Sequence, residues 1–151
     1  MMAEFEQVEH IEKSLRKIAQ IIKQKGRVIL NQFPITPPQF VALQWLNELG
    51  DMTIGDLSNK MHLACSTTTD LVDRMEKNEL VERVKDLKDR RVVRIHLLEK
   101  GETIIQEVIK KRQDYLRDIL QNFSDEDIAF LEKNLHVLHE EMESSAKELN
   151  S

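Results

Sequence analysis

Apolar residues recur every three or four positions along most of the chain, which is the spacing of amphipathic helices. In the stretch 4–31 the apolar stripe consists of Val8, Ile11, Leu15, Ile18 and Ile22. The same spacing returns from 99 to 123 and again from 125 onward. The two ends of the chain therefore predict three long helices, each with one apolar face.

Between these ends the pattern predicts shorter helices. Thr36 is a natural N-cap, and Pro37 suits the first position of a helix that stops at Gly50. Residues 56–62 predict a short third helix, and a run of hydroxyl residues then opens a fourth, with Ser66 or Thr67 as its expected N-cap. Two short helices joined by a brief turn are the outline of a helix-turn-helix.

After the fourth helix the spacing of apolar residues changes from the helical pattern to that of extended strands. Residues 80–84 and 92–97 are rich in β-branched side chains, and a polar link at 85–91 separates them. This pattern predicts a β-hairpin. Because the link is longer than a two-residue turn and lacks glycine, we expect it to project as a loop. The predicted fold class is mainly α with a small β-hairpin (α+β).

Length and composition narrow the class of protein. A chain of 151 residues with 40% hydrophobic content can bury a core of its own. No apolar run approaches the roughly 18 residues that cross a bilayer, and the first residues are acidic rather than signal-like. A single cysteine excludes an internal disulfide. We expect a cytoplasmic protein that has no membrane partner.

The distribution of charge matters more than its total. The net charge of -5 disfavours a uniformly basic nucleic-acid binder. Residues 102–151, however, carry twelve acidic and six basic groups, whereas 83–94 carry six basic and only two acidic groups. The hairpin is therefore locally basic, at +4. A projecting basic loop next to a helix-turn-helix is an electrostatic footprint for DNA.

No glycine-rich linker or repeat divides the chain, so the sequence predicts one structural unit over 1–151. Within it, 37–98 is the compact middle, and 4–31 and 102–149 are the flanking helices. Those helices have more apolar surface than a middle of this size can cover. The economical explanation is a homodimer with interleaved end helices; the alternative is a monomer whose helices fold back.

Four stretches carry a resemblance to a known family: ITPPQFVAL (35–43), STTTDLVDRMEK (66–77), DRRVVRIHL (89–97) and EKG (99–101). In this order they are similar to the second-helix opening, the recognition helix, the wing and the fifth-helix entry of the MarR family of bacterial winged helix-turn-helix transcription regulators. The resemblance covers nearly the whole chain. It implies a winged helix-turn-helix flanked by N- and C-terminal dimerisation helices.

The resemblance also implies a function. A homodimer would bind a pseudo-palindromic operator in double-stranded DNA, with a recognition helix in each major groove and a wing at the flanking minor groove. It would act as a repressor, released by a small aromatic or anionic effector. The predicted DNA-binding residues are Ser66, Thr67, Thr68, Thr69, Arg74, Lys77, Lys85, Lys88, Arg90 and Arg91.

Within that set, the side-chain chemistry indicates different roles. Short hydroxyls at the start of the recognition helix suit phosphates and base edges, and Arg91 matches the wing-tip arginine that enters the minor groove. Asp89 matches an acid that supports the wing through an ion pair with Arg74 or with a wing arginine. Asp70 departs from the family, and either pairs with a neighbouring arginine, which we favour, or accepts from a cytosine amino group.

Other functions have weaker support. Cys65 precedes the recognition helix and is a candidate redox site, although a buried, inert thiol is the favoured interpretation. His136 and His139 share a helix face, but no spacing typical of a zinc site occurs. The sequence predicts no cofactor and no enzyme. The alternatives to an effector-released repressor are a helical dimeric adaptor without DNA binding and a redox- or zinc-responsive regulator.

Overall fold

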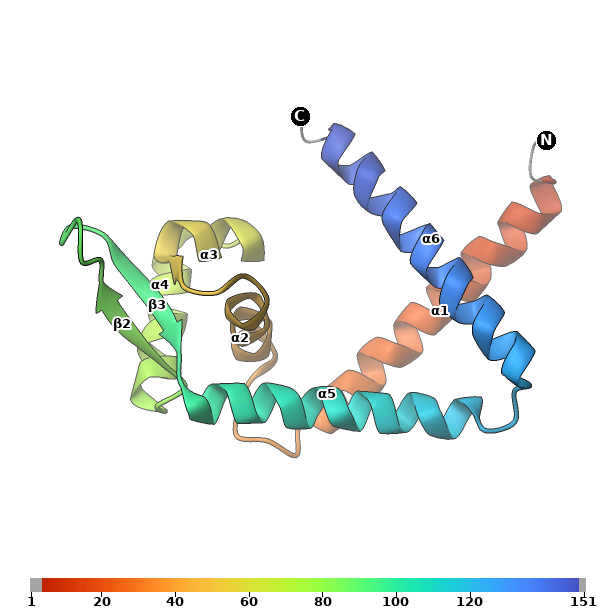
Figure 1. Cartoon of the computed structure of the whole chain (residues 1–151), viewed down its shortest axis with the longest axis horizontal. Coiled ribbons are helices and arrows are strands. Elements are labelled where there is room, and N and C mark those ends of the chain that lie inside the picture. Colours follow the sequence, from red (N-terminus) through yellow and green to blue (C-terminus); the bar gives the residue numbers. More distant parts are fainter. Residues whose placement is uncertain (1–3, 150–151) are drawn as a thin grey trace. The chain divides into compact units, whose positions relative to one another are not determined.

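The computed structural model describes residues 4–149, which form six helices and one small antiparallel sheet (Figure 1). In chain order the elements are α1 (Phe5–Leu30), α2 (Pro37–Leu49), β1 (Met52–Thr53), α3 (Ile54–Met61), α4 (Cys65–Lys77), β2 (Val81–Lys85), β3 (Val93–Leu97), α5 (Glu99–Leu120) and α6 (Asp125–Leu149). The mainly helical fold class and the order of the predicted elements are confirmed.

The chain divides into two compact units, 1–112 and 113–151. The boundary falls inside α5, which continues without a break from one unit into the next. The sequence did not predict this division, because an unbroken helical pattern contains no turn or linker residue that marks it. The interpretation of 1–151 as one unit stays a prediction.

The sheet has the strand order β1-β3-β2, with both pairings antiparallel. In the predicted hairpin, Val81 lies opposite Leu97 and Lys85 opposite Val93. The third strand pairs Met52 with Ile95 across some forty intervening residues. Strand periodicity cannot identify a two-residue strand that depends on so distant a partner.

The capping residues predicted from the sequence determine where α2 begins and ends. The backbone N–H of Gln39 donates to the Thr36 hydroxyl at 3.3 Å, and the Thr36 N–H donates to the Gln39 side-chain oxygen at 3.1 Å. This is a reciprocal capping box. At the other end Gly50 has φ 83°, a left-handed conformation that glycine adopts without strain.

The core joins α2, α3, α4, the sheet and the first half of α5. Its fully buried side chains include Phe40, Leu43, Leu57, Val72, Met75, Leu80, Ile95, Ile105 and Val108. Each of these elements contributes the apolar face that its periodicity predicts. Because α4 and β3 share this core, the recognition helix and the hairpin are held in one rigid arrangement.

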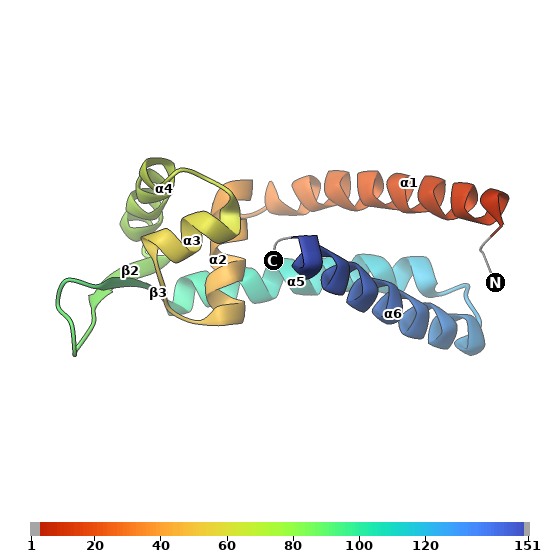
Figure 2. The ribbon, with the colours of Figure 1, turned by 90° about the horizontal axis from the view of Figure 1, so that it is seen from above.

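The long helix α1 contributes little to that core (Figure 2). Its buried residues are confined to its C-terminal end, at Gly26, Ile29 and Leu30. The apolar stripe further toward its N-terminus stays open, and about half of the Ile18 and Ile22 side-chain surfaces is exposed.

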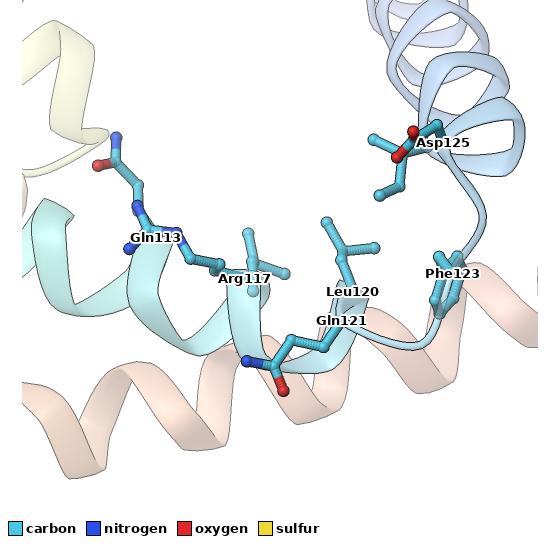
Figure 3. Close-up of a pocket in the computed structure, with 8 residues that line it drawn as sticks. Gln113, Arg117, Leu120, Gln121, Phe123 and Asp125 are labelled. Carbon is cyan, nitrogen blue, oxygen red and sulfur yellow. The ribbon is translucent and has the colours of Figure 1, made fainter.

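In the second unit, α5 and α6 meet at a short corner (Figure 3). The backbone N–H of Asp127 donates to the Ser124 hydroxyl at 3.1 Å, so Ser124 caps the start of α6. An open cavity of about 500 Å³ lies in this corner. Its apolar lining residues are Leu116, Leu120, Phe123 and Ile128.

Gly101 allows the first turn of α5 to lie close to the Leu80 carbonyl and the Leu97 side chain. A Cβ at Gly101 would lie 2.6 Å from the Leu80 carbonyl oxygen and 2.8 Å from the Leu97 Cδ1 atom. The carbonyl cannot retreat cheaply, because it accepts the Leu98 N–H at 3.0 Å. Only glycine fits between the first turn of α5 and the start of the hairpin.

We therefore expect Gly101→Ala to lower the free energy of unfolding by about 1–3 kcal/mol, since overpacking outweighs the gain in helix propensity. Gly55→Ala is the matched control, because its Cβ would meet only the Thr53 hydroxyl at 3.8 Å. Urea unfolding of both variants checks the expectation. Equal midpoints for Gly101→Ala and the wild type would contradict it.

Candidate nucleic-acid interface

Helix α4 buries one face and presents the other to solvent. Thr68, Val72 and Met75 are its buried residues. Ser66 and Thr67 at its start are exposed, as are Arg74 and Lys77 toward its end. The exposed residues fit the predicted interface.

Thr68 was wrongly included in the predicted set of DNA-binding residues. Its side chain is completely buried, and its hydroxyl donates to the Ala64 carbonyl at 3.0 Å. The Thr69 hydroxyl similarly donates to the Cys65 carbonyl at 2.9 Å and is half-buried. The hydroxyl run looks uniform in the sequence, but the rotation of the helix divides it between core and solvent.

The start of α4 also differs from the prediction. Ala64 occupies the N-cap position without a side-chain hydrogen bond, so neither Ser66 nor Thr67 caps the helix. Cys65 is the first helical residue, and its thiol is exposed rather than buried. Its sulfur lies 3.5 Å from the Ser58 hydroxyl. The expected burial of this thiol is therefore wrong, and the redox role stays an untested alternative.

Ion pairs join the second half of α4 to the hairpin. The Arg83 guanidinium donates to Asp73 at 2.6 Å and to Glu76 at 2.7 Å. The Arg83 backbone N–H also donates to Glu76, at 3.2 Å. Arg83 therefore orients β2 against α4, a positioning role that a count of basic residues cannot identify.

Two aspartates organise the loop between β2 and β3, which we call the wing (Asp86–Val92). Asp86 accepts the Lys88 N–H at 2.7 Å and pairs with Arg94 at 3.0 Å. The hydrogen bond from the Lys88 N–H and, to a smaller extent, the one from Arg94 lower the pKa of Asp86. Asp86 thus stays ionised and holds the base of the wing together.

Asp89 pairs with Arg91 at 3.1 Å and also accepts the Arg91 backbone N–H at 3.1 Å. The prediction that a wing arginine supports Asp89 is confirmed, and the predicted pairing with Arg74 is wrong. Arg74 instead borders an open cavity between α4 and the start of α2.

The remaining basic residues of the hairpin are open to solvent. Lys85, Lys88 and Arg90 are exposed and, within the described range 4–149, form no ion pair. The Arg91 side chain is 91% exposed despite its contact with Asp89. Leu87, which is not among the predicted interface residues, is also completely exposed. The wing therefore presents both cations and one apolar side chain to solvent.

A histidine ties the sheet to the end of α2. His96 Nδ1 lies 2.8 Å from an Asp51 carboxylate oxygen. This hydrogen bond, together with the nearby Glu82 charge, raises the pKa of His96, although burial opposes it. Protonated His96 consequently holds β3 more firmly to the turn before β1.

Across 4–149 no group of three or more histidine, cysteine or acidic residues could hold a metal ion. His136 and His139 lie 3.0 Å from Glu140 and Glu143 respectively. None of the described helices is long and apolar enough to cross a membrane.

These elements define a winged helix-turn-helix with an exposed recognition helix and a basic wing. A family model described as "MarR family" matches residues 35–93. The chain is 74% identical over 137 residues to the HTH-type transcriptional regulator YsmB of Bacillus subtilis, covering 91% of this chain and 94% of that protein. The chain belongs to the MarR family of winged helix-turn-helix transcription regulators.

Two further relatives agree with this assignment. A MarR family protein from Bacillus stearothermophilus has 62% sequence identity and a TM-score of 0.86, with 93% of this chain and 99% of that chain covered. The HTH-type transcriptional repressor MdtR of Bacillus subtilis is 26% identical over 118 residues, covering 78% of this chain and 76% of that protein. The predicted membership of the MarR family is confirmed.

The His96–Asp51 contact predicts a pH dependence of stability. Because the folded-state pKa of His96 is raised, its stabilisation is complete below the unfolded value of about 6.5 and is lost as pH rises through the folded value. The pair is nearly half exposed, so we expect less than about 1 kcal/mol. Urea unfolding between acidic and mildly alkaline pH should show this loss in the wild type and not in His96→Gln. Identical pH profiles would contradict the assignment.

Proposed function

We propose that the chain is a homodimeric repressor that binds a pseudo-palindromic operator in double-stranded DNA. The observation that carries this proposal is the state of the wing charges. Both acids of the loop are engaged by Arg91 and Arg94, whereas Lys85, Lys88 and Arg90 form no ion pair with any other residue of 4–149. A net positive surface therefore adjoins the exposed start of α4, and phosphate is its natural ligand.

Contacts of two kinds follow from this surface. Ser66 and Thr67 lie where a recognition helix enters the major groove and offer hydroxyls to base edges and phosphates. Arg91 extends from the wing toward the flanking minor groove, where a narrow A·T-rich tract attracts a guanidinium. Lys77, Lys85, Lys88 and Arg90 neutralise phosphates on either side.

Dimerisation follows from the uncovered apolar faces. In α1 the side chains of Val8, Ile11 and Ile18 are each about half exposed. In α6 the same holds for Leu135 and Met142. Such stripes on helices of this length are covered when a second copy of the chain packs against them. Two copies related by a two-fold axis then present two recognition helices to two half-sites.

A repressor needs a means of release. The relative MdtR is named a repressor, and we assign repression to this chain as well. A small aromatic or anionic effector that binds beside α4 would shift the population away from the DNA-binding arrangement. The cavity of about 430 Å³ between α4 and the start of α2, which Arg74 borders, supports this part of the proposal.

The wing assignment predicts the effect of Arg91→Ala. We expect binding to a duplex from the region upstream of the chain's own gene to weaken at least about fivefold at fixed salt. If Arg91 touches phosphate, the slope of log K against log salt also falls by about one. Fluorescence anisotropy at several salt concentrations measures both quantities.

Arg16→Ala is the control for this measurement, because Arg16 forms only an exposed ion pair with Glu12 on α1. It should bind DNA as the wild type does. An Arg91→Ala variant with unchanged affinity and slope would reject the role of the wing.

The dimer assignment predicts the effect of Ile18→Asp. A charge without a partner in a dimer interface costs about 3–5 kcal/mol, so the dimer should dissociate at least a hundredfold more readily. Light scattering across a dilution series reports the oligomeric state. The control Lys13→Asp changes a position roughly 140° around the same helix and should stay dimeric. A monomeric wild type, or a dimeric Ile18→Asp, would contradict the assignment.

A further inference from the structure

The centre of the exposed face of α4 is occupied by an acid. Thr68 and Val72 are completely buried and define the inner face of the helix. Successive residues are rotated by roughly 100°, so Asp70 points away from these two side chains, and it is exposed. Ser66 and Lys77 lie close to the same line along the helix. Asp70 is therefore the residue that a DNA major groove would meet most directly.

The other two acids of α4 form ion pairs, whereas Asp70 forms none within residues 4–149. Asp73 and Glu76 both bind Arg83. Asp70 has no ion-pair or hydrogen-bond partner among residues 4–149, although Arg74 follows one turn later on the same helix. It borders the open cavity that Thr67 and Arg74 also line. The ion pair expected between Asp70 and a neighbouring arginine is therefore not formed among residues 4–149.

An unpaired carboxylate on a surface that faces DNA is repelled by the phosphates. That repulsion is offset only where the carboxylate meets a hydrogen-bond donor in the groove. Cytosine offers its N4 amino group there and no acceptor of its own, whereas adenine places the N7 acceptor beside its amino group. The partner that fits a free carboxylate best is therefore cytosine.

We propose that Asp70 is a specificity-determining residue that accepts a hydrogen bond from a cytosine amino group at one fixed position of each operator half-site. This inference rests on the proposed function, because it requires α4 to enter the major groove. The two-fold symmetry of the dimer places the second cytosine on the opposite strand of the other half-site. Asp70 thereby discriminates among sequences while it weakens non-specific binding.

The test is a selection from a library of random-sequence duplexes with the purified full-length chain. The wild type should enrich a palindrome with cytosine at a fixed position. Exchange of that C·G pair for T·A should weaken wild-type binding about 5- to 150-fold. Asp70→Asn should lose this cytosine and shift the preference at the same position toward adenine, with the rest of the palindrome unchanged.

Glu82→Gln is the matched control, because it removes the same charge from an exposed position on β2. Both variants should gain a similar amount of general DNA affinity, but Glu82→Gln should keep the cytosine. If Asp70→Asn enriches the wild-type palindrome unaltered, the role of Asp70 is overturned and the proposed function stands. If the wild type enriches no sequence at all, the proposed function fails and the role of Asp70 falls with it.

Discussion

The arrangement of the DNA-binding surface depends on one close contact, where the first turn of α5 packs on the start of the hairpin. Leu98 donates its N–H to the Leu80 carbonyl, and Gly101 leaves room for that carbonyl to approach. Leu80 in turn follows α4 directly and is buried in the core. The end of α4, the start of the hairpin and the first turn of α5 therefore meet at a single buried junction. A displacement of the first turn of α5 would move Leu80, which joins α4 to β2.

A second constraint is the pairing of acids within the winged helix-turn-helix. Asp73 and Glu76 bind Arg83, Asp86 binds Arg94, and Asp89 binds Arg91. These contacts orient the hairpin, and the acidic partners offset part of its positive charge. The charge that remains is concentrated on a few exposed lysines and arginines. A protein of net charge -5 can present such a surface to DNA, and binding through so few charges would require base contacts in addition to phosphate contacts.

Local chemistry explains which features the sequence could predict. Thr36, Pro37 and Gly50 determine the bounds of α2 through their own backbone preferences, and the change of period at 80–97 identifies the hairpin. Features that depend on tertiary packing could not be found in this way. The burial of Thr68 depends on the rotation of α4 against the core, and the pairing of Met52 with Ile95 depends on a distant strand. The partner of Asp89 depends on the conformation of the loop, which residue types alone do not define.

We infer that two copies of α4 and of the wing bind two half-sites from one side of the duplex. Hydroxyl-radical footprinting on the region upstream of the chain's own gene tests it most directly. We predict two protected half-sites whose centres lie about one helical turn, or 10–10.5 base pairs, apart, with further protection in the minor groove on their outer sides. Rising salt should remove all of these protections together. A single protected segment, or uniform protection without a dyad, would contradict the account.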